Sequence, residues 1–296
     1  MAPTNRVLTA EHLTRFFGRG DTRTTAFRDL DVAVPRGEWT TVLGPAGSGK
    51  TALFECLTGL ALPSEGSVFI HDGKHSRRRA LELSSLSDNA RTRLRRSRIG
   101  ALPSECDLMP SLTLRENLLL GTRLARHRVD RAAFREQCAD YGLGAHLRKS
   151  PDSVPADVRL RARLLRTLLT EPDVLLLDEP TAALEAGQTA DLLQLLRELV
   201  TAHHTVVVCT SDDRMAEQGD HVLMLPGGLP AGVDRPHPGS PGDSRVPRMP
   251  ALKGVPPVTA PPRPAQTEPD PVAAELLPVP ASRLQVTTPG EEPSRC

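Results

Sequence analysis

Eight residues decide the fold of this chain: Gly44-Pro45-Ala46-Gly47-Ser48-Gly49-Lys50-Thr51. They match the pattern G-x-x-x-x-G-K-[ST] in full, between a predicted strand over residues 39–43 and a predicted helix over residues 51–60. Glycines in such a loop let successive backbone N–H groups point at phosphate oxygens, and the helix N-terminus adds favourable partial charge. The stretch therefore predicts a nucleoside triphosphate site. The alternative, a glycine-rich turn that matches by chance, leaves the flanking elements unexplained.

A second motif supplies acidic partners for this loop. Residues 174–177 are apolar and read as a buried strand, and Asp178 and Glu179 follow directly. Asp178 is predicted to hold Mg²⁺ through water, and Glu179 to polarise the attacking water. A strand that ends in solvated charge is the alternative. The upstream loop favours catalysis, since Lys50 is predicted to reach the β- and γ-phosphates and Thr51 to coordinate Mg²⁺.

Strand-like and helix-like stretches alternate along the first 225 residues. This alternation predicts an α/β fold whose parallel sheet is connected by crossover helices. Further strands are predicted over residues 7–13, 25–34, 66–70, 205–209 and 222–225, and further helices over residues 113–124, 131–147, 155–169 and 187–199.

Composition indicates the extent of the globular domain, the compartment of the protein and the partners that are excluded. The chain has 296 residues with 37 Lys and Arg against 36 Asp and Glu, which argues against a protein that coats nucleic acid. Because 18 of the 28 prolines lie in residues 226–296, residues 230–296 are predicted to be a disordered tail and residues 1–229 a globular domain. The 5 scattered cysteines favour a reducing compartment. No signal peptide or long apolar run is read, so a soluble, cytoplasmic chain is expected.

Residues 7–225 resemble the ATP-binding subunit of ATP-binding cassette (ABC) transporters. The resemblance is carried by the glycine-rich loop, by the acidic strand end with Pro180-Thr181, and by further segments typical of the lipoprotein-release and macrolide-export branch: S-S-L-S-D at 84–88, R-R-S-R-I-G at 95–100 and L-M-P-S-L-T at 108–113. It implies a P-loop NTPase cassette with a mostly parallel core sheet, N-terminal antiparallel strands and a helical subdomain over about residues 101–170.

The same resemblance implies partners and further site residues. Such subunits bind Mg-ATP, form homo- or heterodimers with another ATP-binding subunit, and drive a membrane permease, here in export, from the inner face of the plasma membrane. Phe17 occupies the place of an aromatic residue that stacks on adenine, with ordinary core packing as the alternative. The candidate nucleotide-binding residues are Gly44, Pro45, Ala46, Gly47, Ser48, Gly49, Lys50, Thr51, Ala52 and Phe17; Glu179 and Lys50 are the catalytic candidates, and Thr51 and Asp178 the metal ligands.

Three positions depart from the family pattern. The signature L-S-G-G-Q falls on residues 154–158, where Pro155 has no N–H and Asp157 places a carboxylate where a phosphate should approach. Ser104 stands at the glutamine-loop position and Ser211 at the switch-histidine position, and a serine hydroxyl is expected to be too short for either reach. Loss of one positioned donor costs about 10²–10³ in rate. We therefore expect ATP binding to be intact and hydrolysis to be weak.

Other functions stay open or fit less well. A regulatory pseudo-ATPase that binds nucleotide with little turnover is the main alternative. A small-molecule kinase fits the leucine-rich strand followed by D-E-P-T less well. The arginine-rich stretch over residues 77–98 holds no aromatic residue, so nucleic-acid binding is disfavoured against a solvated helix face. Leu108, Met109 and Leu112 are candidates for contacting the permease, with core packing as the alternative.

Overall fold

The computed structural model of the chain describes residues 5–18, 23–71, 80–105, 108–124, 128–201 and 204–226. The predicted tail over residues 230–296 lies outside the described residues, as do residues 77–79 at the start of the arginine-rich stretch. Every residue predicted to bind nucleotide or magnesium is described.

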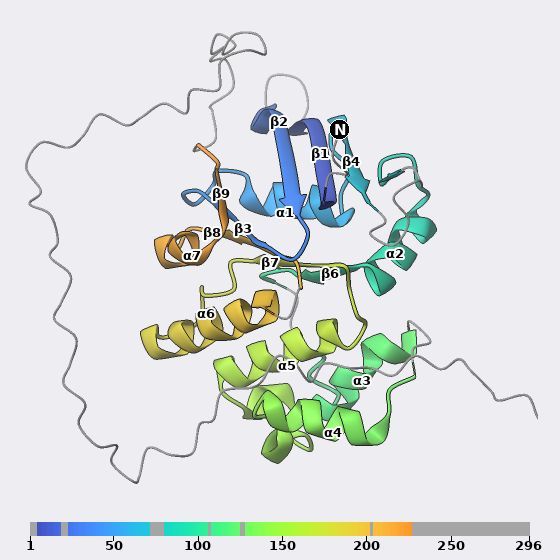
Figure 1. The fold of residues 1–296 in the computed structure, drawn as a ribbon, viewed down its shortest axis with the longest axis vertical. Coiled ribbons are helices and arrows are strands. Elements are labelled where there is room, and N and C mark those ends of the chain that lie inside the picture. The colour runs from blue at the N-terminus through green and yellow to red at the C-terminus, as the bar shows by residue number, and fades with distance from the viewer. Residues whose placement is uncertain are drawn as a thin grey trace, which may run out of the picture. The chain divides into compact units, whose positions relative to one another are not determined.

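A five-stranded parallel sheet runs through the middle of the structure (Figure 1). Apolar, largely β-branched or leucine-rich runs form its inner strands, and both β7 and β8 are buried along their whole length because other elements cover both faces. The strand order is β6 (Ile99–Leu102), β7 (Val174–Asp178), β8 (Val206–Thr210), β3 (Trp39–Leu43) and β9 (His221–Met224). The predicted α/β class with a parallel core sheet is confirmed.

A second, antiparallel sheet is built mainly from the N-terminal part of the chain. Two long strands, β1 and β2, pair as a hairpin that brings Phe17 opposite Thr24. The order is β2 (Thr24–Pro35), β1 (Arg6–Phe17), β4 (Glu65–Ile70) and β5 (Leu81–Glu82). These pairings confirm the prediction of antiparallel N-terminal strands.

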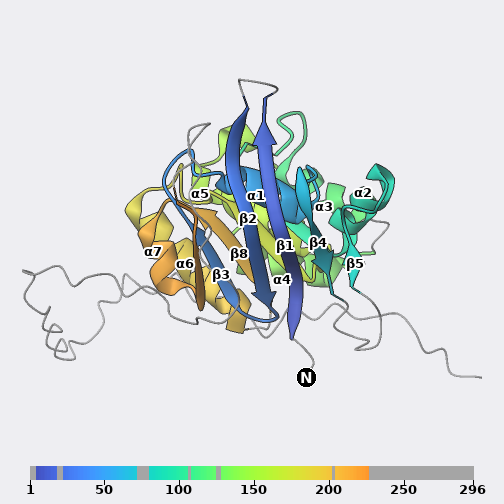
Figure 2. The ribbon, with the colours of Figure 1, turned by 90° about the horizontal axis from the view of Figure 1, so that it is seen from above.

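Helix α1 (Lys50–Thr58) lies between the two sheets, and Figure 2 shows β1, β2 and β4 lying across it. Its buried side chains Leu53 and Phe54 share one apolar core with Leu8 of the antiparallel sheet and Val42 and Val207 of the parallel sheet. A helix that is apolar on most sides is stable in such a sandwiched position, since each fully buried Leu or Phe contributes about 1.5–3 kcal/mol. The first turn of α1 is thus held rigidly at the sheet edge.

Helices α5 (Ala156–Leu168), α6 (Ala186–Thr201) and α7 (Asp213–Gln218) pack on the other face of the parallel sheet. Their core joins Trp39 and Leu175 of the sheet to Leu164 and Leu196 of the helices. Helices α3 (Leu114–Leu124) and α4 (Arg131–Asp140) lie beyond α5 (Figure 1). Within the described ranges, no helix combines the length and apolar character that crossing a membrane requires.

One predicted element boundary is corrected by the structure, and several short elements are added. The helix predicted over residues 131–147 ends at Asp140, because Gly142 turns the chain with φ of 66° and a short 3-10 turn, η2 (Gly144–His146), follows. A second 3-10 turn, η3 (Pro151–Ser153), precedes α5. Helix α2 (Asp88–Ser97) lies in the arginine-rich stretch, where a solvated helix face was favoured without bounds, and strand β6 stands where no element was predicted.

Helix α2 carries much of the arginine-rich stretch, and part of that charge has an intramolecular use. Arg95 donates to the carbonyl oxygen of Gly59 at 2.6 Å, at the end of α1. Arg98 pairs with Asp173, just before β7, at 2.6 Å. These arginines fasten α2 to the core, which favours a structural role for them.

Candidate active site

The candidate site lies where parallel strands end at a common edge. In open α/β sheets, ligands bind outside the carboxyl ends of the strands. The glycine-rich loop follows β3, the two acidic residues Asp178 and Glu179 close β7 or follow it, and Ser211 follows β8. Because β7, β8 and β3 are adjacent in the sheet, these three segments meet at one place.

The glycine-rich loop is tightly confined by its neighbours. Gly49 adopts a φ of 94°, a left-handed conformation that side chains disfavour, and a Cβ on it would lie 2.9 Å from the carbonyl oxygen of Ala26. A Cβ on Gly44 would lie 2.6 Å from the carbonyl oxygen of Leu225. Close backbone approach on both sides therefore explains the glycines at the two ends of the loop.

Lys50 begins α1 and is almost fully buried, with 5% of its surface exposed. Its Nζ donates to the carbonyl oxygens of Gly44 at 2.8 Å and Pro45 at 2.9 Å, and lies 3.1 Å from Oε1 of Glu179. Buried cations require such partners. The ammonium group is thus held at the mouth of the loop, where a phosphate could take over from these acceptors.

Asp178 accepts two hydroxyl hydrogen bonds on the same oxygen. Thr51 Oγ1 donates to Asp178 Oδ2 at 3.0 Å, and Ser104 Oγ donates to the same atom at 3.2 Å. Burial raises the pKa of this carboxyl above its usual range, and the two hydroxyl hydrogen bonds act in the opposite direction. The other oxygen, Oδ1, is buried and has no hydrogen-bond partner among the described residues.

This arrangement fits Mg²⁺. Magnesium prefers oxygen ligands and commonly combines one or two carboxylates with substrate phosphates and water. The unpaired Oδ1 of Asp178 and the neighbouring hydroxyl of Thr51 provide oxygens of the right kind. The described part of the chain contains no group of three or more His, Cys, Asp or Glu suited to a metal, so such an ion would depend on phosphate and water for its other ligands.

Glu179 is anchored by several hydrogen bonds, on a backbone of unusual conformation. Its φ is 44°, in the left-handed region, a strained value for a residue with a side chain. Its Oε2 accepts from Ser211 N at 3.1 Å, Thr210 Oγ1 at 3.2 Å and Ser211 Oγ at 3.3 Å. With Oε1 beside Lys50, both oxygens of Glu179 are fixed at the sheet edge.

A cavity of about 650 Å³ opens beside the loop. The loop and α1 contribute Gly47 and Lys50 to its lining, and the ends of β1 and β2 contribute Phe17 and Thr24. Phe17 is 45% exposed, so it is not a core residue, and the guanidinium of Arg15 lies 5.1 Å from its ring centroid. The structure therefore places this exposed ring on the same cavity as the predicted phosphate loop.

The start of α5 is built differently. Pro155 is its N-cap residue, and no side chain caps this end. Ser153, two residues earlier, donates to the carbonyl oxygen of Ser150 at 2.8 Å and caps neither end of α5. Asp157 pairs with Arg161 one turn later and accepts from Gln188 at 3.4 Å. The first turn of α5 therefore presents a carboxylate that is already engaged within the protein.

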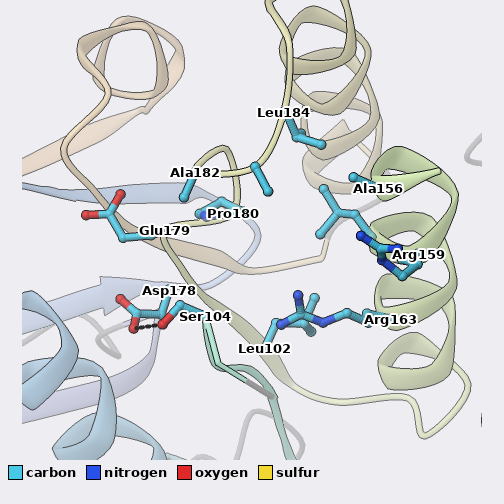
Figure 3. Close-up of a pocket in the computed structure, with 12 residues that line it drawn as sticks. Leu102, Ser104, Ala156, Arg159, Arg163, Asp178, Glu179, Pro180, Ala182 and Leu184 are labelled. Atoms are coloured by element: carbon cyan, nitrogen blue, oxygen red, sulfur yellow. Dashed lines mark hydrogen bonds between the residues drawn. The ribbon is translucent and has the colours of Figure 1, made fainter. Parts of the chain in front are cut away.

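A second cavity, of about 100 Å³, separates α5 from the end of β7 (Figure 3). Asp178 and Ser104 line one side of it, and Arg159 and Arg163 line the other. Arg163 donates to the carbonyl oxygen of the residue before Ser104, so it ties α5 to the segment that follows β6. Figure 3 shows the carboxylate of Glu179 pointing away from α5.

The two serines at degenerate family positions have contacts that the sequence reasoning missed. It treated Ser104 and Ser211 as too short for the family roles, yet each donates to one of the two site carboxylates. A signal was present: Ser104 follows β6 and Ser211 follows β8, so both come after strands on either side of β7. Only the strand order shows which carboxylate each serine meets.

Comparisons with known proteins agree with this geometry. The sequence profile of the ABC transporter family matches residues 27–182, more than half of the chain. The lipoprotein-releasing system ATP-binding protein LolD of Xylella fastidiosa is 34% identical over 232 residues, which cover 77% of this chain and 93% of that protein. An uncharacterised ABC transporter ATP-binding protein of Mycobacterium tuberculosis is 33% identical over 208 residues, or 69% of this chain. The chain spans only 59% of the length of that mycobacterial relative.

A solved structure extends the likeness to three dimensions. The ATP-binding cassette MJ0796, in a dimeric structure bound to ADP and Pi, matches with a TM-score of 0.66 and 26% sequence identity. The match covers 74% of this chain and 94% of that chain. The fold, the phosphate loop and these likenesses together show that the chain belongs to the ABC transporter family, as an ATP-binding cassette.

Proposed function

We propose that this chain binds Mg-ATP at the edge of β3, β7 and β8 and couples ATP binding and hydrolysis to a separate membrane permease. One observation carries the proposal: beside the glycine-rich loop, Lys50 pairs with Glu179 at 3.1 Å and Thr51 donates to Asp178 at 3.0 Å, so that the two motifs meet through two direct contacts. The ABC transporter profile and the name of LolD support a transport role.

Each residue has a distinct part in the proposed chemistry. Backbone N–H groups of the loop and the α1 N-terminus bind the phosphates, and Lys50 exchanges its contacts with Gly44 and Glu179 for phosphate oxygens. Thr51 and Asp178 hold Mg²⁺, which neutralises charge on the β- and γ-phosphates. Glu179 then orients the attacking water through the carboxylate that Thr210 and Ser211 hold in place. The exposed ring of Phe17 stacks on the adenine, and Ala52 lies beside the nucleotide.

Hydrolysis is proposed to be weak. In the family, the signature helix of one subunit faces the γ-phosphate bound by the other. Here Pro155 offers no N–H, and Asp157 adds negative charge where that phosphate approaches. Ser211 is committed to Glu179 by two hydrogen bonds, which supports its serving as an anchor for that carboxylate.

The family resemblance also suggests how the protein is organised and what it assembles with. We propose that the ATP-binding domain spans residues 1–229, with a helical subdomain near residues 101–170, and that ATP affinity does not require residues 230–296. The domain pairs with a second ATP-binding subunit, identical or different, and sits on the inner face of the plasma membrane against a permease that works in export. A role in binding nucleic acid is not proposed.

The test is ATP turnover by the purified full-length chain with Mg²⁺. We expect slow hydrolysis that Glu179→Gln lowers by about 10²–10³ while ATP still binds. The exposed Glu217→Gln, on α7, is the matched control and should hydrolyse ATP like the wild type. Binding of ATP without turnover above Glu179→Gln would establish the pseudo-ATPase alternative, and failure to bind ATP at all would refute the proposal.

A further inference from the structure

Glu55 is a charged residue that lines the larger cavity. The proposed chemistry gives it no role. Glu55 belongs to α1, is half-buried and lines the cavity together with Phe17 and Lys50. Within the described ranges, no hydrogen bond or ion pair joins its carboxylate to another side chain. A half-buried carboxylate on the wall of a ligand cavity is available to accept hydrogen bonds from a bound molecule.

Helix geometry places Glu55 beyond the phosphate end of the cavity. Residues three and four apart lie on one helix face, so Glu55 shares its face with Thr51 and Ala52, which also line the cavity. Four residues of α-helix span about 6 Å along the axis. Glu55 is therefore displaced by about one helical turn from the hydroxyl predicted to bind Mg²⁺, and it lines the same cavity as Phe17, the residue proposed to stack on adenine.

The charges along the cavity favour one orientation of the ligand. Lys50 marks one end, and the adjacent Glu179 is already paired with Lys50 and with hydroxyl and N–H donors. Glu55 has no such described partner, so its negative charge repels phosphates and attracts hydroxyl donors. The triphosphate is thereby directed toward Lys50 and the sugar toward Glu55.

The chemistry of a ribose fits this carboxylate. The 2′- and 3′-hydroxyls are neighbouring donors, and a carboxylate presents two acceptor oxygens, so two charge-assisted hydrogen bonds can form together. An acidic residue on the ribose hydroxyls is an established solution in dinucleotide-binding folds. We infer that Glu55 binds the ribose hydroxyls and makes this chain selective for ribonucleotides over deoxyribonucleotides. The inference rests on the proposed function, because it requires a nucleotide in this cavity.

Equilibrium titration of the full-length chain with four Mg²⁺-bound probes tests the inference: ATP, 2′-deoxy-ATP, 3′-deoxy-ATP and inorganic tripolyphosphate. The wild type should bind ATP about 10-fold more tightly than either deoxy analogue, as expected for losing one hydrogen bond to a charged group. Glu55→Ala should weaken ATP to the level of the deoxy analogues and leave those analogues and tripolyphosphate unweakened. Glu55→Gln should retain part of the preference. Glu217→Ala, a change at an exposed residue of α7, is the matched control and should keep the preference in full.

Other results of these titrations would refute either the role of Glu55 or the proposed nucleotide site. Equal binding of ATP and both deoxy analogues by the wild type would refute the role of Glu55. So would an equal loss of affinity for all four probes in Glu55→Ala, because that pattern indicates a structural defect. In either case, tripolyphosphate binding that Lys50→Ala abolishes would leave the proposed phosphate site standing. If no probe binds, or Lys50→Ala changes nothing, the proposed function fails and the ribose inference fails with it.

Discussion

The starts of α1 and α5 are both helix N-termini near the end of β7, yet their chemistry is opposite. Helix α1 begins after glycines, with Lys50 at its first position and no side chain capping its end. Helix α5 begins after Pro155, and Asp157 in its first turn is held by Arg161 and Gln188. One end is open to an anion, and the other already carries one.

The difference shows that a helix dipole alone does not make an anion site. Both helices offer partial positive charge at their first turn. At α1 the glycines allow the backbone to curl and expose N–H groups, whereas at α5 the Asp157 carboxylate occupies the favourable position itself. The same physical effect therefore supports ligand binding at one helix and helix stability at the other.

The largest expected effect comes from removing the cation at the start of α1. Lys50→Ala should lower ATP affinity by about 100-fold, because charge-assisted hydrogen bonds to two phosphates are lost. Titration with a fluorescent ATP analogue measures this, and circular dichroism checks the fold. Exposed Lys149→Ala is the matched control and should bind like the wild type. Unchanged affinity in Lys50→Ala would remove the contrast between the two helices.

A smaller loss is expected from the loop backbone. Gly49→Ala forces a side chain into a left-handed conformation and against the carbonyl oxygen of Ala26, which costs about 1–3 kcal/mol. Chemical denaturation and ATP titration should both show a decrease. Gly187→Ala, in α6, is the control: a Cβ there meets nothing within 4 Å, so its stability should stay equal or rise. Equal behaviour of the two variants would contradict the account of the loop.

The comparison can also be tested by making α5 more like α1. Pro155→Ser with Asp157→Gly supplies an N-cap hydroxyl and removes the carboxylate, so ATP turnover should rise roughly 10-fold. Steady-state phosphate release measures it. Asp152→Gly, an exposed change in the preceding turn, should have no effect. A double variant with wild-type turnover would show that the start of α5 does not limit hydrolysis.

The smallest effect concerns pH. Burial raises the pKa of Asp178 in the folded state, so the stability that this carboxyl contributes is present at acid pH and is lost as the pH rises through the raised value. Asp178→Asn should therefore gain stability relative to the wild type between about pH 4 and pH 8. Thermal unfolding across that range measures the difference. Exposed Asp191→Asn is the control, and a difference that shrinks as pH rises would contradict the assignment.

Sequence reasoning succeeded where a pattern has one structural solution. Strand β3 was predicted over residues 39–43 and has those bounds, and the loop and α1 follow as expected. Helix α2 was anticipated only as a solvated helix face somewhere in residues 77–98, and its bounds were not predicted because none of its residues is buried. The early end of α4 was missed because the turn depends on the conformation of Gly142.

Within the site, motifs located residues but not their partners. The acidic pair and the loop were found because their spacing and strand context are characteristic. The hydrogen bonds of Ser104 to Asp178 and Ser211 to Glu179 depend on β6 and β8 lying on either side of β7. Strand order is set by long-range packing, so a single sequence does not reveal it.

The close approach of Leu225 to Gly44 links the backbone just after β9 directly to the phosphate loop. Leu225 donates its N–H to the carbonyl oxygen of Leu43 at 2.8 Å, and its own carbonyl oxygen lies where a Cβ on Gly44 would sit. The next residue, Pro226, is exposed. Tension applied to anything attached beyond residue 226 would thus be delivered first to the backbone that binds phosphate, before it reached any helix.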